Sequence, residues 1–341
     1  MTVASPVAPE EPDSVARPRR TVPPFAKLLG LTAGLGIILV VLLMLFIMPS
    51  LKSGAHDLPI GLVGSPSAVA QVEEGLATAA PDAYATRAYD SEADLEAAIL
   101  DRDVVGGIVV EDTGVHALVA SAGSAVISST ISATANALAG STGAEVVVTD
   151  VVPLPDADPT GVGIGGLAFP LVFGGIVPAV AFRKVFSRSL PWAVGGILAF
   201  AAVGGITVSA VLMYVFGSIT TGFWPVAAAM ALGIAALALP LAGLQEVFGG
   251  RGFTIGAMAM MFLGNPLAGI STTAAWLPSG LGVIGQILPP GAAGTLVRSV
   301  AYFGGAGGLT AGLTLTAWVV AGLALLALGV VRTRRRALPT A

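Results

Sequence analysis

The sequence contains no cysteine, only two histidines and few charged residues. Of its 341 residues, 11% are Asp, Glu, Lys or Arg, whereas a soluble globular domain has about 25%. The absence of cysteine excludes disulfides, thiolate zinc sites and iron–sulfur clusters. The net charge of −4 provides no overall basic character of the kind that binds nucleic acid, so no nucleic-acid partner is expected.

The scarcity of charge leaves long apolar runs. Charged residues and histidine are missing from the 21 residues 28–48, the 55 residues 190–244, the 46 residues 252–297 and the 33 residues 299–331. A helix that crosses a bilayer needs about 20 apolar residues, and a charge at the bilayer centre costs several kcal/mol. These runs predict an integral membrane protein and exclude a soluble enzyme.

Six membrane-spanning helices are predicted. The first covers residues 28–48. It follows a proline-rich tail over residues 1–27, predicted to be a disordered cytoplasmic segment, and it does not end in a signal-peptide cleavage site. The 55-residue run that begins at Leu190 must fold back, and the turn residues of Gly217–Pro225 mark the break. The remaining spans are expected near 161–182, 190–216, 226–244, 253–270 and 309–331.

Residues 271–308 are apolar but are interrupted by Pro278, Pro289 and Pro290. A crossing here would give seven spans and basic termini on opposite sides, whereas a re-entrant or interfacial segment gives six spans. With six spans, 12 of the 16 Lys and Arg residues fall on the side of the N-terminus, as the positive-inside rule requires. We therefore expect a multi-pass protein of a bacterial cytoplasmic membrane, with both termini cytoplasmic and a basic tail over 332–341.

Residues 51–160 hold 16 of the 20 acidic residues and only three basic ones, which indicates an extracytoplasmic domain. Periodicity predicts strands at 58–64, 83–89, 105–110, 115–120 and 145–149 with helices between them. One helix is expected to be capped by Ser91 with Asp94 and to carry the stem of Arg102 on its inner face. The expected fold is thus an all-α six-helix membrane bundle, one plus five spans over 28–48 and 161–331, with an inserted extracytoplasmic α/β domain.

Motifs of catalysis and cofactor binding are largely absent. Gly161-x-Gly163-x-x-Gly166 matches a dinucleotide-binding pattern only formally, because no strand precedes it and no acidic residue follows about 20 positions on. No Gly-Lys pair occurs, so the chain has no Walker A loop. His56 and His116 have no partner at a recognised spacing and are interpreted as structural. We expect no catalytic residue, cofactor or metal site, and no enzyme activity.

The predicted bundle is also poor in carboxylates. Glu246 is the only acidic residue after Asp158. Carriers coupled to protons or sodium generally place ionisable groups inside the bundle. If this protein transports a solute, the energy is therefore expected to come from elsewhere.

Several segments carry a resemblance to a known family. They are Leu58-Pro-Ile-Gly-Leu-Val, Ser91-x-x-Asp-Leu-x-x-Ala-Ile-Leu followed by Val105-Gly-Gly-Ile-Val-Val, Gly264-Asn-Pro, Leu288-Pro-Pro-Gly and Arg298-Ser-Val-Ala-Tyr-Phe-Gly. With the layout of one span, an α/β domain and five spans, the chain resembles permeases of the second-type ABC exporters, in the subgroup of phage-infection-protein-like membrane proteins. The resemblance implies a separate cytoplasmic ATP-binding subunit and an outer re-entrant segment that contains Asn265, Pro266, Pro289, Pro290 and Arg298.

Between the second and third predicted spans lies a candidate ATPase-coupling loop with Arg183, Lys184, Phe186 and Arg188. Its alternation of basic and apolar residues suits a short amphipathic helix that docks into a groove of a partner. The same basic residues also serve as topology anchors against anionic lipid, and both interpretations stay open.

Two functions are compatible with these features. The first is a permease subunit, in a homodimer or in a heterodimer with a second permease, that exports an apolar or amphipathic substrate with the help of a separate ATPase. The alternative is a non-transporting envelope protein whose outer domain binds a partner or assists secretion. An intramembrane enzyme is disfavoured because the spans contain no pair of polar catalytic groups.

Overall fold

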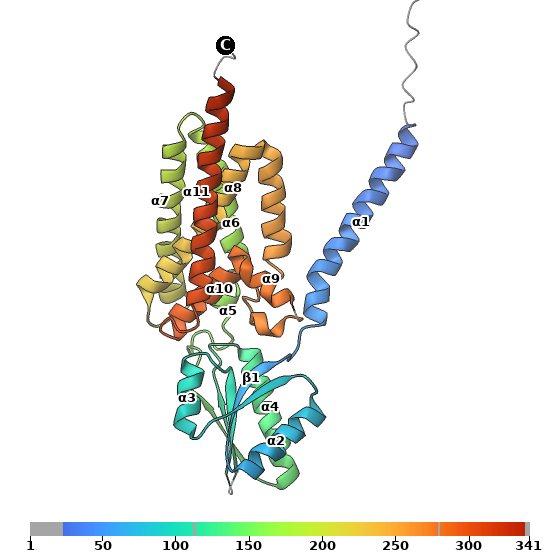
Figure 1. The fold of residues 1–341 in the computed structure, drawn as a ribbon, viewed down its shortest axis with the longest axis vertical. Coiled ribbons are helices and arrows are strands. Elements are labelled where there is room, and N and C mark those ends of the chain that lie inside the picture. Colours follow the sequence, from blue (N-terminus) through green and yellow to red (C-terminus); the bar gives the residue numbers. More distant parts are fainter. Residues whose placement is uncertain (1–22, 112–113, 279, 338–341) are drawn as a thin grey trace, which may run out of the picture. The chain divides into compact units, whose positions relative to one another are not determined.

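The structure is a computed structural model, and it describes residues 23–111, 114–278 and 280–337. Within these residues five helices are long and apolar enough to cross a membrane (Figure 1). They are Pro24–Met48, Val162–Val185, Leu190–Val215, Phe223–Gly264 and Leu309–Arg332. The chain therefore has the helical make-up of a membrane protein, together with a separate small α/β domain.

The first of these helices, α1 (Pro24–Leu51), is one continuous helix of 28 residues. At 1.5 Å per residue it is about 42 Å long, which exceeds a hydrocarbon core of about 30 Å. Leu, Ile and Val occur on all of its faces, as in a helix made for hydrocarbon surroundings.

The α/β domain contains a five-stranded sheet in the order β2-β1-β3-β4-β5. Only β3 and β4 pair antiparallel; the other neighbours are parallel. The predicted strands are confirmed to within two residues, and the predicted turn residues Asp112 and Thr113 lie outside the described residues. The strands are β1 (Leu58–Val63), β2 (Tyr84–Ala88), β3 (Gly106–Glu111), β4 (Gly114–Val119) and β5 (Glu145–Asp150).

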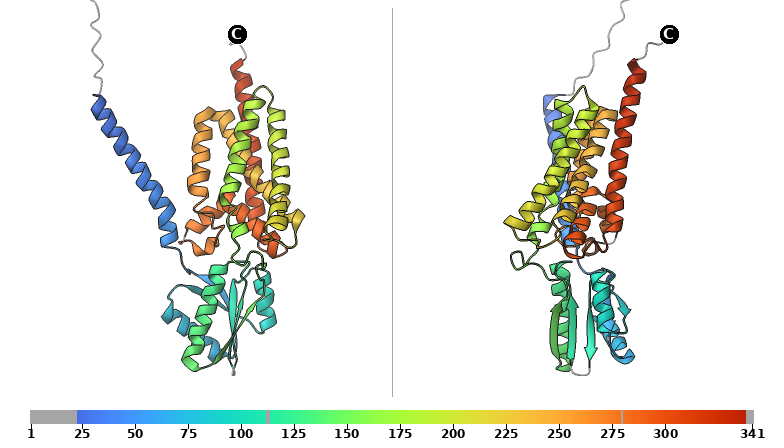
Figure 2. Two further views of the ribbon diagram at one scale, coloured as in Figure 1. Left: turned by 180° about the vertical axis from the view of Figure 1, so that it is seen from behind. Right: turned by 90° about the vertical axis from the view of Figure 1, so that its left-hand side faces the viewer.

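Three helices cover the two faces of this sheet (Figure 2). α2 (Pro66–Ala79) and α4 (Ala125–Thr142) pack on one face through residues such as Leu76 and Ile131. α3 (Glu92–Leu100) packs on the other face through Leu95 and Ile99. In chain order the helices therefore alternate between the two faces of the sheet, and each face has its own apolar core.

The predicted cap of α3 is confirmed. The Ser91 hydroxyl accepts a hydrogen bond from the Asp94 amide at 3.1 Å and donates one to the Asp94 carboxylate at 2.6 Å. The expectation that Arg102 lies on this helix is wrong, because α3 ends at Leu100 and Arg102 has a left-handed backbone with φ 63°.

The bundle is built around the long helix α8 (Phe223–Ala259), which continues into a π-helical turn, η2 (Met260–Gly264). The first arm of α8 is largely buried between Val226 and Gly243, whereas the neighbouring helices are apolar on exposed faces, as expected for helices that contact lipid. Gly322 shows how closely α11 packs on α8, since a Cβ at this position would lie 2.6 Å from the Leu239 backbone carbon. The neighbours of α8 are α6 (Ala168–Val185), α7 (Leu190–Ala210), α10 (Pro289–Tyr302) and α11 (Leu309–Ala337). The short helix α5 (Val162–Gly165) precedes α6, and α7 ends in a π-helical turn, η1 (Val211–Val215).

The α8–η2 segment folds back on itself at Gly249 (Figure 1). Gly249 has φ 70° and ψ −160°, a backbone conformation that is open essentially only to glycine. A Cβ at Gly256 would lie 3.0 Å from the Leu241 side chain, although 15 positions would separate them by about 22 Å in a straight helix. The spans predicted near 226–244 and 253–270 therefore occupy the two arms of one segment of 42 residues.

After the second arm the chain forms only short helices. They are η3 (Ala274–Trp276), α9 (Leu281–Ile287) and α10 (Pro289–Tyr302). With seven and 14 residues, α9 and α10 are about 10 and 21 Å long, which is too short to cross a bilayer. Within residues 265–278 and 280–308, nothing supports the alternative of a seventh span.

Candidate functional site

One end of the bundle, here called the basic end, carries Arg183, Lys184, Arg188, Arg251 and Arg332. Arg183 in the last turn of α6 forms an ion pair with Glu246 of α8, and the two side chains are 15% and 17% exposed. Glu246 is the single acidic residue that follows Asp158 in the sequence. The Glu246 carboxylate is therefore bound to a cation rather than free to relay protons.

An aromatic stack lies beside this ion pair. The Phe186 ring stacks on Phe182 with centroids 6.4 Å apart, and on Trp192 at 6.3 Å. Val185 and Trp192 are 71% and 69% exposed. The basic end therefore presents apolar surface next to positive charge, a composition compatible with the lipid interface as well as with docking of another protein.

The candidate coupling loop is shorter than expected. α6 continues to Val185 and α7 begins at Leu190, so residues 186–189 alone connect them. A separate amphipathic helix over 182–191 is not formed. Lys184 and Arg188 are exposed, whereas Phe186 is half-buried. Their role in coupling stays a prediction.

The residues of the candidate re-entrant segment are brought together. Pro289 and Pro290 are buried in the first turn of α10, and Pro290 packs against Gly264 at the end of η2. Asn265 and Pro266 directly follow this turn.

Hydrogen bonds tie the same segment to the rest of the bundle. Arg298 is buried and donates to the Ile270 carbonyl at 2.6 Å. The Tyr302 hydroxyl donates to the Ser218 carbonyl at 2.7 Å. The Trp318 indole of α11 donates to the Ile287 carbonyl at 2.8 Å. The segment is therefore fixed to the residues that follow η2, to the connection between η1 and α8, and to α11.

A large apolar groove of about 660 Å³ lies between the start of α6 and the end of α7. One wall is the π-helical turn η1, a feature that is frequent at functional sites. The volume falls within the range of about 300–1,000 Å³ that is typical of ligand pockets. No pattern in the sequence predicts this groove. It is lined by residues such as Leu167, Pro170, Val208, Val211, Val215 and Phe216.

Asp158 is the one charged residue that lines the groove. Its carboxylate accepts hydrogen bonds from the amides of Val162 and Gly163, both at 2.8 Å, and thereby caps α5. Burial raises the pKa of Asp158, but the Ser218 hydroxyl and the backbone amides together outweigh burial and lower the pKa below its ordinary value of 3.8. An ionised carboxylate thus stands at one end of an otherwise apolar groove.

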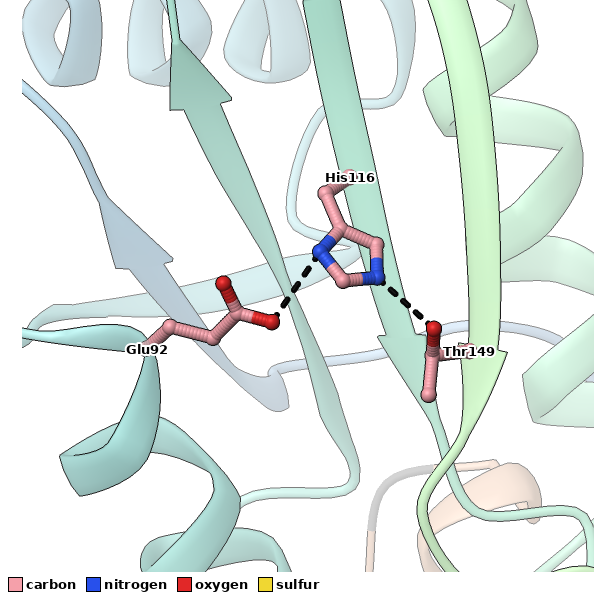
Figure 3. Close-up of polar contacts among 3 residues, drawn as sticks. All are labelled: Glu92, His116 and Thr149. Atoms are coloured by element: carbon pink, nitrogen blue, oxygen red, sulfur yellow. Dashed lines mark hydrogen bonds and ion pairs between the residues drawn. The ribbon is translucent and has the colours of Figure 1, made fainter.

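His116 on β4 has partners that the sequence did not reveal. Its Nδ1 lies 3.0 Å from a Glu92 carboxylate oxygen, and its Nε2 lies 2.8 Å from the Thr149 hydroxyl (Figure 3). His116 therefore is not isolated in the fold: Glu92 of α3 and Thr149 of β5 lie beside it on the face of the sheet that α3 covers. Its interpretation as a structural residue stays a prediction. The order hydroxyl, imidazole, carboxylate resembles a catalytic triad, but the three residues join three elements and none of them lines the apolar groove.

The described residues contain no group of three or more His, Cys, Asp or Glu side chains that could hold a metal ion. Comparison of the chain with protein-family models, with curated proteins and with solved structures gives no match.

Proposed function

We propose that the chain is the permease subunit of an ABC-type exporter of the second type, which moves an apolar or amphipathic substrate across a bacterial cytoplasmic membrane. In this proposal the first arm of the α8–η2 segment crosses the membrane, and the second arm, which is helical only to Gly264, crosses together with the following residues up to Ile270. This gives six spans and two cytoplasmic termini. The basic end faces the cytoplasm, and the α/β domain lies outside.

The observation that carries the proposal is the pairing of Glu246 with Arg183. Proton- or sodium-driven transport requires ionisable groups that exchange their ion inside the bundle. Glu246 is held in an ion pair at the end of the bundle, and the Asp158 carboxylate in the groove is held by the amides of Val162 and Gly163. Neither group is placed to exchange an ion through the bundle, so the driving force has to reach the protein from outside. A separate ATP-binding subunit supplies that force, consistent with the absence of a Walker A loop from the sequence.

The apolar groove favours transport over the alternative of a non-transporting envelope protein. A protein that only presents its α/β domain to a partner has no use for a groove of about 660 Å³ within its helices. Its apolar lining and the single carboxylate of Asp158 suit a substrate with a long apolar part. The permease is proposed to work as a homodimer or as a heterodimer with a second permease.

The proposal is tested by purifying the tagged full-length chain from its native membranes in a mild detergent and measuring ATP hydrolysis. The chain produced alone in a heterologous host is the control, because it has no nucleotide site of its own. We expect hydrolysis only in the native preparation, together with a second polypeptide that contains a Walker A motif. A folded native preparation without hydrolysis favours the envelope protein instead.

A further inference from the structure

Two arginines meet where the α/β domain joins the bundle. The guanidinium carbon of Arg102 lies 5.0 Å from the centre of the Phe303 ring, next to the end of α10. Arg298 of α10 is 7% exposed. Burial and the nearby Arg102 charge lower the pKa of Arg298 to about 10. The two cations therefore repel each other, and neither has an ion pair with a carboxylate in the described part of the chain.

The backbone of Arg102 is held in a conformation that arginine disfavours. The amide of Arg102 donates to the Ile99 carbonyl and that of Asp103 to the Ala98 carbonyl, which closes α3 with a Schellman motif. The left-handed position of this motif is usually glycine, and another residue costs about 1–2 kcal/mol there. With φ 63°, Arg102 carries this cost. A backbone outlier of this kind points to a role for the side chain.

The Arg102 side chain lines a small cavity of about 80 Å³. Its Nη1 atom is buried and has no hydrogen-bond partner among the described residues, and the same holds for the Thr273 hydroxyl in the same cavity. Ser124, the N-cap of the 18-residue helix α4, also lines it, so the positive end of a helix dipole adds to the guanidinium charge. Buried polar groups in native proteins almost always have a partner.

No nearby carboxylate forms an ion pair with Arg102 in the described part of the chain. Asp101 and Asp103 flank Arg102 in the sequence but are exposed. The Asp150 and Asp158 carboxylates accept hydrogen bonds from backbone amides. Arg102 as a whole is half-buried, but its Nη1 atom is enclosed without a partner, and an anion in the cavity would supply that partner.

We propose that this cavity binds a small oxyanion of the phosphate class through the guanidinium of Arg102 and the hydroxyl of Thr273. A cavity of about 80 Å³ accommodates a phosphate group but not a whole nucleotide or lipid. The phosphate is therefore either a free ion or the exposed headgroup phosphate of an anionic lipid. Because the cavity contains residues of α3, α4 and the 271–308 segment, the anion stabilises the junction of the two parts. This inference does not depend on transport or on an ATPase.

The test uses the full-length chain in neutral detergent and isothermal titration calorimetry with inorganic phosphate at constant ionic strength. Arg102→Gly is the main variant, since glycine suits the left-handed backbone and the variant is expected to fold. A hydrogen bond to a charged group contributes about 1.5–3 kcal/mol, so the affinity should fall at least about tenfold. Thr273→Val keeps the shape of the side chain and should weaken binding about threefold or more.

Arg102→Gln is paired with Lys52→Gln, which removes one positive charge from an exposed position outside the cavity. The first should lose binding and the second should keep it within about twofold, which separates a local site from general charge attraction. Titration with a short-chain phosphatidylglycerol in mixed micelles distinguishes the two sources of phosphate. Binding of either probe that requires Arg102 supports the proposal. Absence of binding for both probes, or equal binding by the Arg102 variants, overturns it.

Discussion

The Arg183 guanidinium of α6 is paired with the Glu246 carboxylate of α8, three residues before the backbone of α8 breaks at Gly249. The pair thus fixes the connection between α6 and α7 to the segment where the α8 arm reverses. A force applied to that connection would be transmitted directly to α8, the most buried of the membrane-length helices in the described part of the chain. This relationship motivates the coupling role proposed for the basic end.

The pair should behave as a coupled unit in mutants. Glu246→Gln leaves Arg183 buried without a counter-charge, which should lower the free energy of unfolding by about 3 kcal/mol. The double variant Arg183→Gln with Glu246→Gln removes both charges and should be more stable than the sum of the two single changes implies. Denaturant unfolding in detergent measures all four proteins. Strictly additive losses would show that the pair contributes nothing.

Gly249→Ala should destabilise the fold by about 1–3 kcal/mol, because a Cβ is strained at φ 70° and ψ −160° even though no atom lies within 4 Å of it. Gly250→Ala is the matched control: its added Cβ also meets nothing within 4 Å, and the residue does not have a positive φ. In the control a small gain in stability is expected, since alanine is the better helix former. Thermal unfolding compares the two, and equal effects would contradict a glycine-dependent reversal.

Asp158→Asn should destabilise the protein at neutral pH but not in acid. The pKa of Asp158 is lowered in the folded state, so its ionised form contributes stability above the ordinary value of 3.8. This contribution disappears as the pH falls through the folded-state pKa. The difference in melting temperature between wild type and variant should correspond to about 1 kcal/mol at pH 7, the usual value of a helix cap, and should shrink toward pH 3. A difference independent of pH would assign the effect to shape rather than charge.

The proposed topology can be tested by labelling single introduced cysteines, because the native chain has no cysteine. Thr78 on α2 and Ser187 between α6 and α7 are both exposed. In intact cells an impermeant maleimide should label Thr78→Cys but not Ser187→Cys, and both should react after the membrane is opened. The opposite pattern in intact cells would reverse the assignment of inside and outside.

Much of the fold was predictable because its causes are local. Charge-free runs mark membrane helices, since the cost of burying charge in lipid is large. Period-2 and period-3.6 patterns placed the strands and helices of the α/β domain, and the Ser91 cap follows from hydrogen bonds within one helical turn.

The site features were less predictable because they depend on contacts between distant segments. Thr149 lies 33 positions from His116, and their contact requires the pairing of β4 with β5. The spans predicted near 226–244 and 253–270 imply that the chain reverses between them. They do not show that the reversal occurs at Gly249, since one glycine among 45 carries no distinct signal in the sequence. An arginine at the left-handed position after α3 was likewise not foreseen, because local preference favours glycine there.

The most direct test of the account is the rate of ATP hydrolysis by the complex purified through the tagged chain, compared between wild type and Phe186→Ala. The substitution keeps Arg183, Lys184 and Arg188 and therefore the charges that suffice for lipid anchoring. Phe169→Ala, at the opposite end of α6, is the control. The account predicts hydrolysis in wild type and control and its loss in Phe186→Ala, with the topology of all three unchanged. Equal hydrolysis by Phe186→Ala, or none in the wild-type complex, would contradict it.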